Sequence, residues 1–476
     1  MRTEDSDQPG PAGRKVVPFQ TRRILCAVLL LALTSSPKAA ADDWPQWLGP
    51  NRDGVWRETG ILESFPAGGP KTLWRTPIKS GYSGPAVAGG RVYITDRDRQ
   101  LASEPGDPFA RSDVPGAERV LCLNEADGRV LWQHSYPCRY TISYAAGPRV
   151  TPLIHDDKVY TLGAEGHLLC LEAKTGKVLW SRNFKADFNI KAPMWGFAGH
   201  PLIDGERIIC VAGGSGTTAV AFDRNSGKEI WRALDASEPG YSSPVIYEAG
   251  GRRQLIILHA EAANSLDPST GSVYWSVPFK NRMGLGVATP RKLGDLLFFT
   301  SFYDGSLMLK LEASDPKASV LWRSENVDER RTTHLNSIIP TPFLENGHIY
   351  GICSYGQLRC LVAATGERVW ETLQATSAST SAPAAASGDK KPQPVRWGNA
   401  FLIKNGDRFF LFNEHGELII AKLSPAGYEE ISRARILEPT NRDPGRPVVW
   451  SHPAFANRRV YARNDREIVC VDLARP

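Results

Sequence analysis

Aromatic, histidine and arginine side chains recur immediately before short apolar segments of this chain. Ten residues of this kind, including two asparagines, are candidates for a common site: Arg149, Trp195, His200, His334, Asn336, Arg396, Trp397, Asn399, Trp450 and His452. Arginine and histidine bind anions through charge-assisted hydrogen bonds, and tryptophan stacks on planar groups. Together they could hold a planar anionic ligand. The alternative, which we favour, is that they fill the space between the elements that carry them.

Motifs for nucleophilic catalysis or metal binding are missing from the sequence. It contains no G-x-S-x-G and no C-x-x-C motif. The glycine-rich GGSGTT at 213–218 lacks the lysine and the following helix of a phosphate-binding loop. Cys122, Cys170, Cys360 and Cys470 occupy the same apolar frame, which indicates small buried strand residues. We therefore predict no catalytic residue and no metal site.

The composition is that of a globular protein with many turns. The chain has 476 residues, of which 42% are hydrophobic, and its 43 Gly and 35 Pro are spread along most of its length. The formal net charge of +6 comes from Lys and Arg scattered among Asp and Glu, without a long basic run. We expect no nucleic-acid partner, because nucleic-acid binding needs a concentrated basic surface.

The N-terminus resembles an export signal. Basic residues that include Arg22 and Arg23 precede the apolar run ILCAVLLLAL at 24–33, and an A-x-A pattern ending at Ala41 follows. This order predicts a signal peptide over 1–41, cleaved near Ala41, and a periplasmic or secreted product. The apolar run is too short to span a membrane, so no stable membrane insertion is expected. The arginine pair leaves both the Sec and the twin-arginine export routes open.

One phrase recurs along the chain, as in LEAKTGKVLW at 171–180 and LVAATGERVW at 361–370. The tryptophans of the repeat are Trp74, Trp132, Trp180, Trp231, Trp275, Trp322 and Trp370. From Trp132 onward they are separated by 44 to 51 residues, a period typical of repeat folds. Two copies are weaker: 310–322 has an altered turn, and 421–431 ends in Ile431 instead of tryptophan.

Each phrase predicts a β-hairpin whose turn ends in a left-handed glycine. These glycines are Gly128, Gly176, Gly227, Gly271 and Gly366. A second pair of strands lies upstream of each hairpin, and four strands per period make one propeller blade. Eight upstream strand pairs accompany only seven hairpins. The segments 70–78 and 467–476 are each left without a partner strand, and each can supply the strand that the other lacks. The sequence thus predicts an all-β, eight-bladed β-propeller of four-stranded blades, closed by an N-terminal strand in the last blade.

The domain plan follows from the repeat. One propeller domain should span 70–476, preceded by an N-terminal lead-in segment over 42–69. The stretches 96–118 and 375–394 do not fit the repeat and are expected as loop insertions, the second of low complexity. For 96–118 we favour a solvated insertion over a lid on one face. His200 and His452 fall in the third and eighth blades, and we expect them to lie too far apart to share a metal.

The acidic residue, Thr-Gly pair and Trp of the phrase resemble the repeats of the PQQ-like β-propeller family. The resemblance covers about residues 70–476 and is carried by Asp223, Asp267 and the Thr-Gly pairs at 175–176, 270–271 and 365–366. It implies eight blades belted together by tryptophans. It also implies two classes of function, because the family includes dehydrogenases that bind PQQ and calcium on the propeller axis and non-catalytic scaffolds such as the outer-membrane assembly factor.

The residues that precede the innermost strands favour the second class. They are aromatic and cationic with almost no carboxylate, whereas a dehydrogenase needs carboxylates for calcium and for a general base. We therefore predict an exported non-catalytic scaffold, a monomer without cofactor, with envelope proteins or peptides as partners. A PQQ- and calcium-dependent alcohol or sugar dehydrogenase is the first alternative. A glycan-binding module that uses the channel aromatics is the second.

Overall fold

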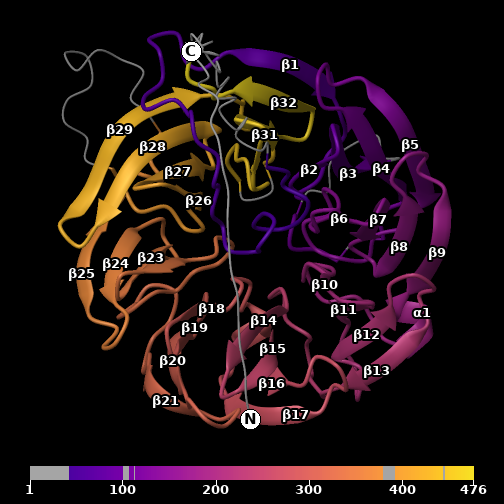
Figure 1. Cartoon of the computed structure of the whole chain (residues 1–476), viewed down its shortest axis with the longest axis vertical. Coiled ribbons are helices and arrows are strands. Elements are labelled where there is room, and N and C mark those ends of the chain that lie inside the picture. Colours follow the sequence, from indigo (N-terminus) through magenta and orange to yellow (C-terminus); the bar gives the residue numbers. More distant parts are fainter. Residues whose placement is uncertain (1–41, 100–106, 112, 379–391, 443–444) are drawn as a thin grey trace, which may run out of the picture. The chain divides into compact units, whose positions relative to one another are not determined.

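Eight four-stranded antiparallel sheets form a ring, which confirms the predicted propeller (Figure 1). The computed structural model describes residues 42–99, 107–111, 113–378, 392–442 and 445–476. The predicted signal peptide over 1–41 and most of the insertion 375–394 lie outside these residues. In the described part of the chain, no helix has the length and apolar character needed to cross a membrane.

The blades follow one another in chain order, each from its innermost to its outermost strand. The first four are β2 (Ala86–Ala88), β3 (Arg91–Arg99), β4 (Gly116–Asn124), β5 (Val130–Pro137); β6 (Leu153–His155), β7 (Lys158–Leu162), β8 (His167–Glu172), β9 (Val178–Asn183); β10 (Leu202–Asp204), β11 (Arg207–Val211), β12 (Ala219–Asp223), β13 (Glu229–Ala233); and β14 (Val245–Ala249), β15 (Arg252–Leu258), β16 (Ala262–Leu266), β17 (Val273–Pro278). The last four are β18 (Arg291–Leu293), β19 (Leu296–Ser301), β20 (Gly305–Leu311), β21 (Ala318–Arg323); β22 (Phe343–Glu345), β23 (His348–Ile352), β24 (Leu358–Val362), β25 (Arg368–Thr372); β26 (Ala400–Asn405), β27 (Arg408–Asn413), β28 (Glu417–Ser424), β29 (Gly427–Arg435); and β30 (Ala454–Ala456), β31 (Arg459–Arg463), β32 (Glu467–Asp472) with β1 (Thr72–Pro77). The short helices α1 (Phe184–Phe188) and η1 (Arg282–Gly284) lie in connections.

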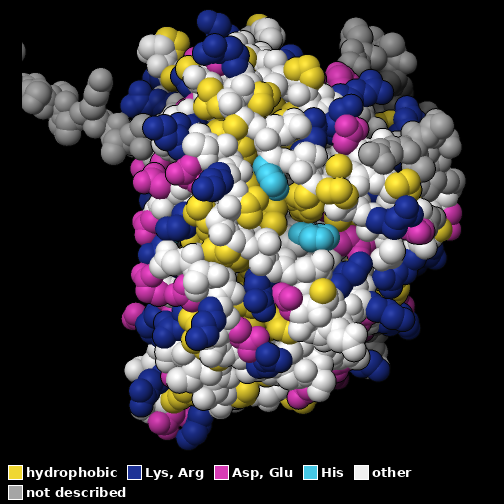
Figure 2. Space-filling model, turned by 90° about the vertical axis from the view of Figure 1, so that its right-hand side faces the viewer, with side chains coloured by type: hydrophobic (Ala, Val, Ile, Leu, Met, Phe, Trp, Pro, Cys, Tyr) yellow, Lys and Arg dark blue, Asp and Glu magenta, His cyan; other side chains and the backbone are white. Residues whose placement is uncertain are grey.

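The two middle strands of a blade are buried on both faces, because a neighbouring blade covers each side. They are therefore continuous apolar runs, such as β11, instead of alternating ones. The outermost strands face solvent and expose side chains such as Leu179 and Ile230. Figure 2 shows this side of the ring with Lys and Arg interspersed among Asp and Glu, which matches the scattered charge of the sequence.

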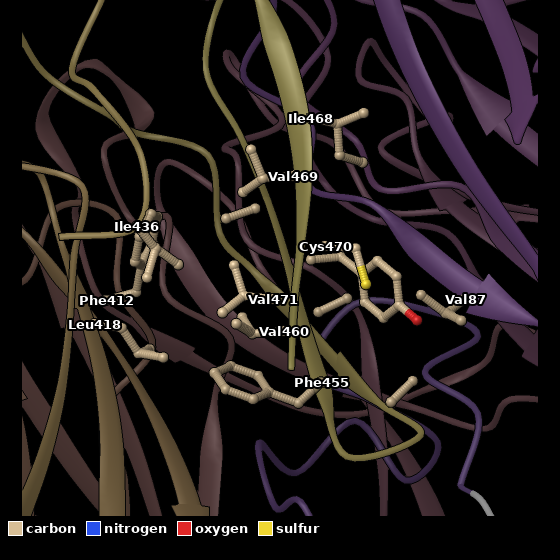
Figure 3. Close-up of a cluster of buried hydrophobic side chains, with 14 of the residues drawn as sticks. Val87, Phe412, Leu418, Ile436, Phe455, Val460, Ile468, Val469, Cys470 and Val471 are labelled. Carbon is tan, nitrogen blue, oxygen red and sulfur yellow. The ribbon is translucent and has the colours of Figure 1, made fainter. Parts of the chain in front are cut away.

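β1 closes the ring by pairing with β32 in the eighth blade, as predicted. Thr72 lies opposite Val471, and Trp74 lies opposite Cys470. Figure 3 shows how alternate residues of β32 point to opposite sides, Ile468 toward the first blade and Val469 toward the seventh. Both ends of the propeller sequence thus share one hydrophobic core, which buries two sheet edges that would otherwise be open.

The repeat tryptophans join each blade to the next at the rim. The indole nitrogen of Trp132 donates to the carbonyl oxygen of Ala173 at 3.0 Å, in the turn between β8 and β9 of the following blade. Equivalent bonds to the next blade, at 2.8 to 3.2 Å, are donated by Trp74, Trp180, Trp231, Trp322 and Trp370. Trp132 also packs on Gly176, whose φ of 74° confirms the predicted left-handed turn. A β-carbon on Gly176 would lie 2.4 Å from a ring carbon of Trp132, so the indole requires glycine there.

Two departures from this belt occur where the following blade has no such turn. Trp275 donates to the side-chain oxygen of Gln254 in its own blade, because the turn of the fifth blade is the altered copy at 310–322. Ile431 replaces tryptophan in β29, and the next blade takes its outermost strand, β1, from the other end of the propeller sequence. The indole bond to the next blade is thus lost where that blade lacks a regular hairpin turn opposite.

The insertion 96–118 is partly strand, so the expectation of a solvated loop is wrong at both of its ends. β3 continues to Arg99 and β4 begins at Gly116, with these two residues paired. Arg97 is fully buried, donates to the carbonyl oxygen of Val114 at 2.7 Å and lies over the ring of Tyr140. Residues 100–106 and 112 lie outside the described residues.

Candidate functional site

The connections that lead into the innermost strands converge at one end of the axial channel. They surround a cavity of about 190 Å³. Its wall is largely aromatic: Trp47, Tyr82, Phe109, Tyr144, Arg149, Trp195, Ala198, His200, Tyr241, Ser243, Leu285, Val287, Tyr303, Ile338, Ile339, Trp397, Trp450 and His452. All eight connections between successive blades contribute to this wall, which we call the channel mouth.

Six of the ten predicted candidates lie together in the channel mouth. They are Arg149, Trp195, His200, Trp397, Trp450 and His452. The rings of Trp397 and Trp450 meet edge to face with centroids 6.4 Å apart, and Trp450 stacks near Tyr144 at 6.1 Å. The four other candidates are not part of the lining.

His334 lies at the rim, not at the axis, so its prediction as a channel residue is wrong. Its ring stacks on Trp322 with centroids 4.8 Å apart, between that indole and the turn at Gly366. The connection 324–342 between β21 and β22 is long enough to reach the rim and return. His334 Nδ1 lies 2.8 Å from the hydroxyl of Ser324, so this histidine extends the belt of tryptophans.

Asn336, Arg396 and Asn399 also lie outside the lining, which corrects their assignment. The buried Asn336 amide donates to the carbonyl oxygen of Phe302 at 3.1 Å and holds two connections together. Arg396 forms an ion pair with Glu329 at 2.7 Å and covers the outer face of the Trp397 ring at 4.5 Å. Asn399 is buried below the wall.

His200 and His452 lie side by side, which overturns the expectation that they would be far apart. Their ring centroids are 5.7 Å apart, and both Nε2 atoms contact the hydroxyl of Thr151 between them. Two blades separate theirs, but side chains that point to the axis converge there. Burial lowers the pKa of His452 to about 3. Burial also holds the pKa of His200 well below its usual value, and repulsion from Arg52 and from a protonated His452 acts in the same direction. Both rings are therefore neutral at neutral pH.

The lead-in segment 42–69 forms the floor beneath this pair. Trp47 stacks on His200 with centroids 4.3 Å apart and meets His452 edge to face at the same distance. Its indole nitrogen donates to the hydroxyl of Thr289 at 2.9 Å. Figure 1 shows the indigo lead-in running into the centre of the ring.

Arg52 closes the channel below Trp47. Its guanidinium donates to the carbonyl oxygens of Pro201 at 2.9 Å and of His200 and Pro244 at 3.2 Å each. Arg291 in turn donates to the carbonyl oxygens of Arg52 and Asp53. Burial lowers the pKa of Arg52 to about 10, so it stays charged at neutral pH. The lead-in segment therefore blocks this end of the channel, and we call the blocked end the plug.

Arg149 is the cation of the channel mouth. It donates to the carbonyl oxygens of Ser143 at 3.0 Å, Tyr144 at 2.7 Å and Gly147, and its guanidinium carbon lies 5.1 Å from the centre of the Tyr82 ring. Among the described residues, no carboxylate pairs with it. Burial lowers the pKa of Arg149, yet a guanidinium keeps its charge at neutral pH. Glu118 and Glu165 act on this charge from a distance, but within the described chain Arg149 forms no ion pair with a carboxylate.

The donor set of the mouth does not fit calcium. The described lining contains no Asp or Glu, and two acidic groups next to lining tryptophans are engaged: Glu414 forms an ion pair with Arg446, and Glu329 with Arg396. Within the described ranges, no three His, Cys, Asp or Glu side chains gather where a metal ion could bind. Calcium takes about six to eight oxygen ligands, carboxylates among them. A quinone held with calcium therefore lacks its ligands here.

Three lining residues that do not precede an innermost strand were not among the predicted candidates. Trp47 comes from the lead-in, Phe109 from the insertion 96–118, and Tyr303 from the turn between β19 and β20. Phe109 packs against Tyr144 and Trp397 at 5.2 and 5.9 Å, so it reaches across the mouth. The aromatic density of WPQWLGPNRDGVW at 44–56 was a usable signal for Trp47, since exposed linkers rarely carry three tryptophans.

The chain matches the model of a known protein family. The family model described as "Outer membrane protein assembly factor BamB" (PQQ_2) matches residues 116–278 and 216–434. The chain belongs to this family. No curated protein matches it in a sequence search.

Two solved structures with TM-scores above 0.5 share the propeller fold of this BamB-family chain, and a third matches it with a lower score. The quinohemoprotein alcohol dehydrogenase of Comamonas testosteroni is 13% identical, with a TM-score of 0.58 over 91% of this chain and 80% of its own. The quinohemoprotein alcohol dehydrogenase ADHIIG of Pseudomonas putida HK5 is 12% identical, with a TM-score of 0.55 over the same shares. BamB from Moraxella catarrhalis is 16% identical, with a TM-score of 0.49 over 84% of this chain and 97% of its own.

Proposed function

We propose that this BamB-family protein is an exported, non-catalytic scaffold of the cell envelope, and that partner proteins or peptides bind on the face that carries the channel mouth. The proposal takes it to be a monomer that carries no cofactor. The basic and apolar pattern of residues 1–41 supports export with cleavage near Ala41. The family match supports a role in protein interaction.

Exposed apolar side chains around the mouth carry this proposal. Phe109, Met283 and Val395 are 40 to 44% exposed. Phe109 lines the cavity itself, and the two others each lie two residues from a lining residue. The other large apolar side chains exposed in the described chain lie on outermost strands, spread around the ring. Exposed apolar side chains on loops that a rigid scaffold positions are typical of an interaction site.

The charges near the mouth also favour binding over redox chemistry. A base for alcohol oxidation must be a carboxylate or another acceptor within reach of the substrate hydroxyl. Burial raises the pKa of Glu414, which is held by Arg446 and the Trp450 indole nitrogen. Its hydrogen bonds fix it as a structural group.

Site-specific photocrosslinking tests the proposed face. A photoreactive phenylalanine at position 109, 283 or 395 should capture one and the same envelope protein, whereas the same group at Ile230 or Leu179 on the outer strands should not. The rim positions are similarly exposed, so they control for chance encounters. Equal capture from rim and mouth would contradict docking at the mouth.

A cofactor titration tests the dehydrogenase alternative. We expect no saturable change in tryptophan fluorescence with PQQ and calcium, and no dye reduction with primary alcohols or aldoses, because the described part of the lining offers calcium no carboxylate. Saturable binding with alcohol-dependent turnover would overturn the scaffold proposal.

A further inference from the structure

The channel mouth pairs an aromatic cavity with one unbalanced cation. Arg149 has five N–H donors, and three hydrogen bonds to carbonyl oxygens of 143–147 account for three of them. The two remaining N–H groups make no hydrogen bond within the described chain, and Arg149 lines the cavity. The polar side chains above the floor hydrogen-bond to one another. His200 contacts the hydroxyl of Ser243 at 3.0 Å, and both His200 and His452 contact the hydroxyl of Thr151.

The neighbouring arginines do not offer a second anion site. Arg396 is paired with Glu329 at 2.7 Å, and Arg446 with Glu414 at 2.9 Å. Among the described lining residues, Arg149 alone is thus left to bind an anionic group, so the ligand should carry one negative charge. A polyanion would leave its remaining charges among aromatic rings, which is costly.

The size and the walls of the cavity define the rest of the ligand. The cavity of about 190 Å³ is open to solvent on one side. It has room for one aromatic ring system with a short acidic arm. The faces and edges of Trp195, Tyr241 and Trp450 would stack on such a ring, whereas a neutral sugar would find few hydrogen-bond partners.

We propose that the channel mouth binds a hydrophobic monocarboxylate, with its carboxylate on Arg149 and its aromatic body among the tryptophans and tyrosines of the wall. A free aryl acid and the C-terminal aromatic residue of a peptide present the same chemistry. The proposal goes beyond the scaffold role and does not depend on it.

Calorimetric titration of the full-length protein with matched probes tests this site. Indole-3-acetate should bind saturably, and its uncharged isostere indole-3-acetamide about ten-fold or more weakly, because it lacks the charge-assisted pair. Arg149→Gln should remove the preference for the acid. Arg111→Gln is the matched control, since Arg111 also donates to backbone carbonyls, of Thr141 and Ala192, but does not line the cavity.

Peptides distinguish the two sources of the carboxylate. Gly-Gly-Trp with a free C-terminus should bind, and its C-terminal amide should not, if peptides are the source; binding of indole-3-acetate alone points to a small acid. Equal affinity for acid and amide, or no binding of either acid, would overturn the proposal. Should Arg149→Gln unfold, the acid-to-amide ratio on the unchanged protein and Trp195→Leu, which removes stacking but keeps the charge, still decide it.

Discussion

The rim and the axis of this propeller are held together in different ways. At the rim, one contact is repeated from blade to blade: an indole nitrogen bonds the turn of the next blade, and a glycine lies under the indole. At the axis, single contacts without copies join the lead-in to the third, fourth and fifth blades through Arg52 and Trp47. Repetition makes the rim redundant, whereas each axial contact has no substitute.

Removing the plug should produce the largest loss. Arg52→Met keeps much of the side-chain volume but leaves three buried carbonyl oxygens without a donor, so the free energy of unfolding should fall by about 4 kcal/mol. Urea denaturation measures this loss. Arg57→Met in the same segment is the control, because its ion pair with Asp53 is exposed and should be worth less than about 1 kcal/mol. Equal losses would remove the distinction between axis and surface.

A glycine pair isolates the contribution of the rim. Gly176→Ala should cost about 3 kcal/mol, since the new methyl group meets Trp132 and the residue keeps a positive φ. Gly205→Ala has a similar φ of 57° but nothing within 4 Å, so only the backbone cost of about 1 kcal/mol remains. Thermal or urea denaturation of both variants gives the difference. If the two lose the same stability, the indole does not constrain the turn.

Acid should weaken the axis more than the rim. His200 and His452 stay neutral in the folded protein, while the unfolded chain takes up protons below about pH 6.5, so stability falls as pH drops from there toward about 3. Above about pH 6.5, neither histidine changes the free energy of unfolding with pH. Each histidine contributes about 1.4 kcal/mol of loss per pH unit. Between pH 7 and pH 4, the free energy of unfolding from urea denaturation should fall by about 3 kcal/mol less in His452→Gln than in the unchanged protein. The exposed His155→Gln should behave as the unchanged protein.

The rim could be predicted from the sequence because its contacts are local and periodic. A hairpin turn and the tryptophan after it lie within about ten residues, and β-hairpins have recognisable turn residues. Even the exceptions had a signal, since the altered turn at 310–322 and Ile431 mark the places where the belt changes. The pairing of β1 with β32 followed from counting the strands.

The axis was harder because its residues come from connections of unequal length. Position before a strand identified six channel residues but misplaced His334, whose connection travels to the rim. The distance between His200 and His452 depends on side-chain length and on the floor made by Trp47, neither of which the repeat encodes. Long-range convergence on an axis is a tertiary property that no local pattern contains.

The position of β1 has a consequence for biosynthesis. Thr72–Pro77 is made before every other strand of the propeller, yet its partner Glu467–Asp472 is made last. Throughout translation and any passage across a membrane, this segment must wait with an unpaired edge, and such edges invite association with other chains. β32 therefore completes the ring, and a variant that lacks Glu467–Asp472 should be degraded by proteases faster than the complete propeller.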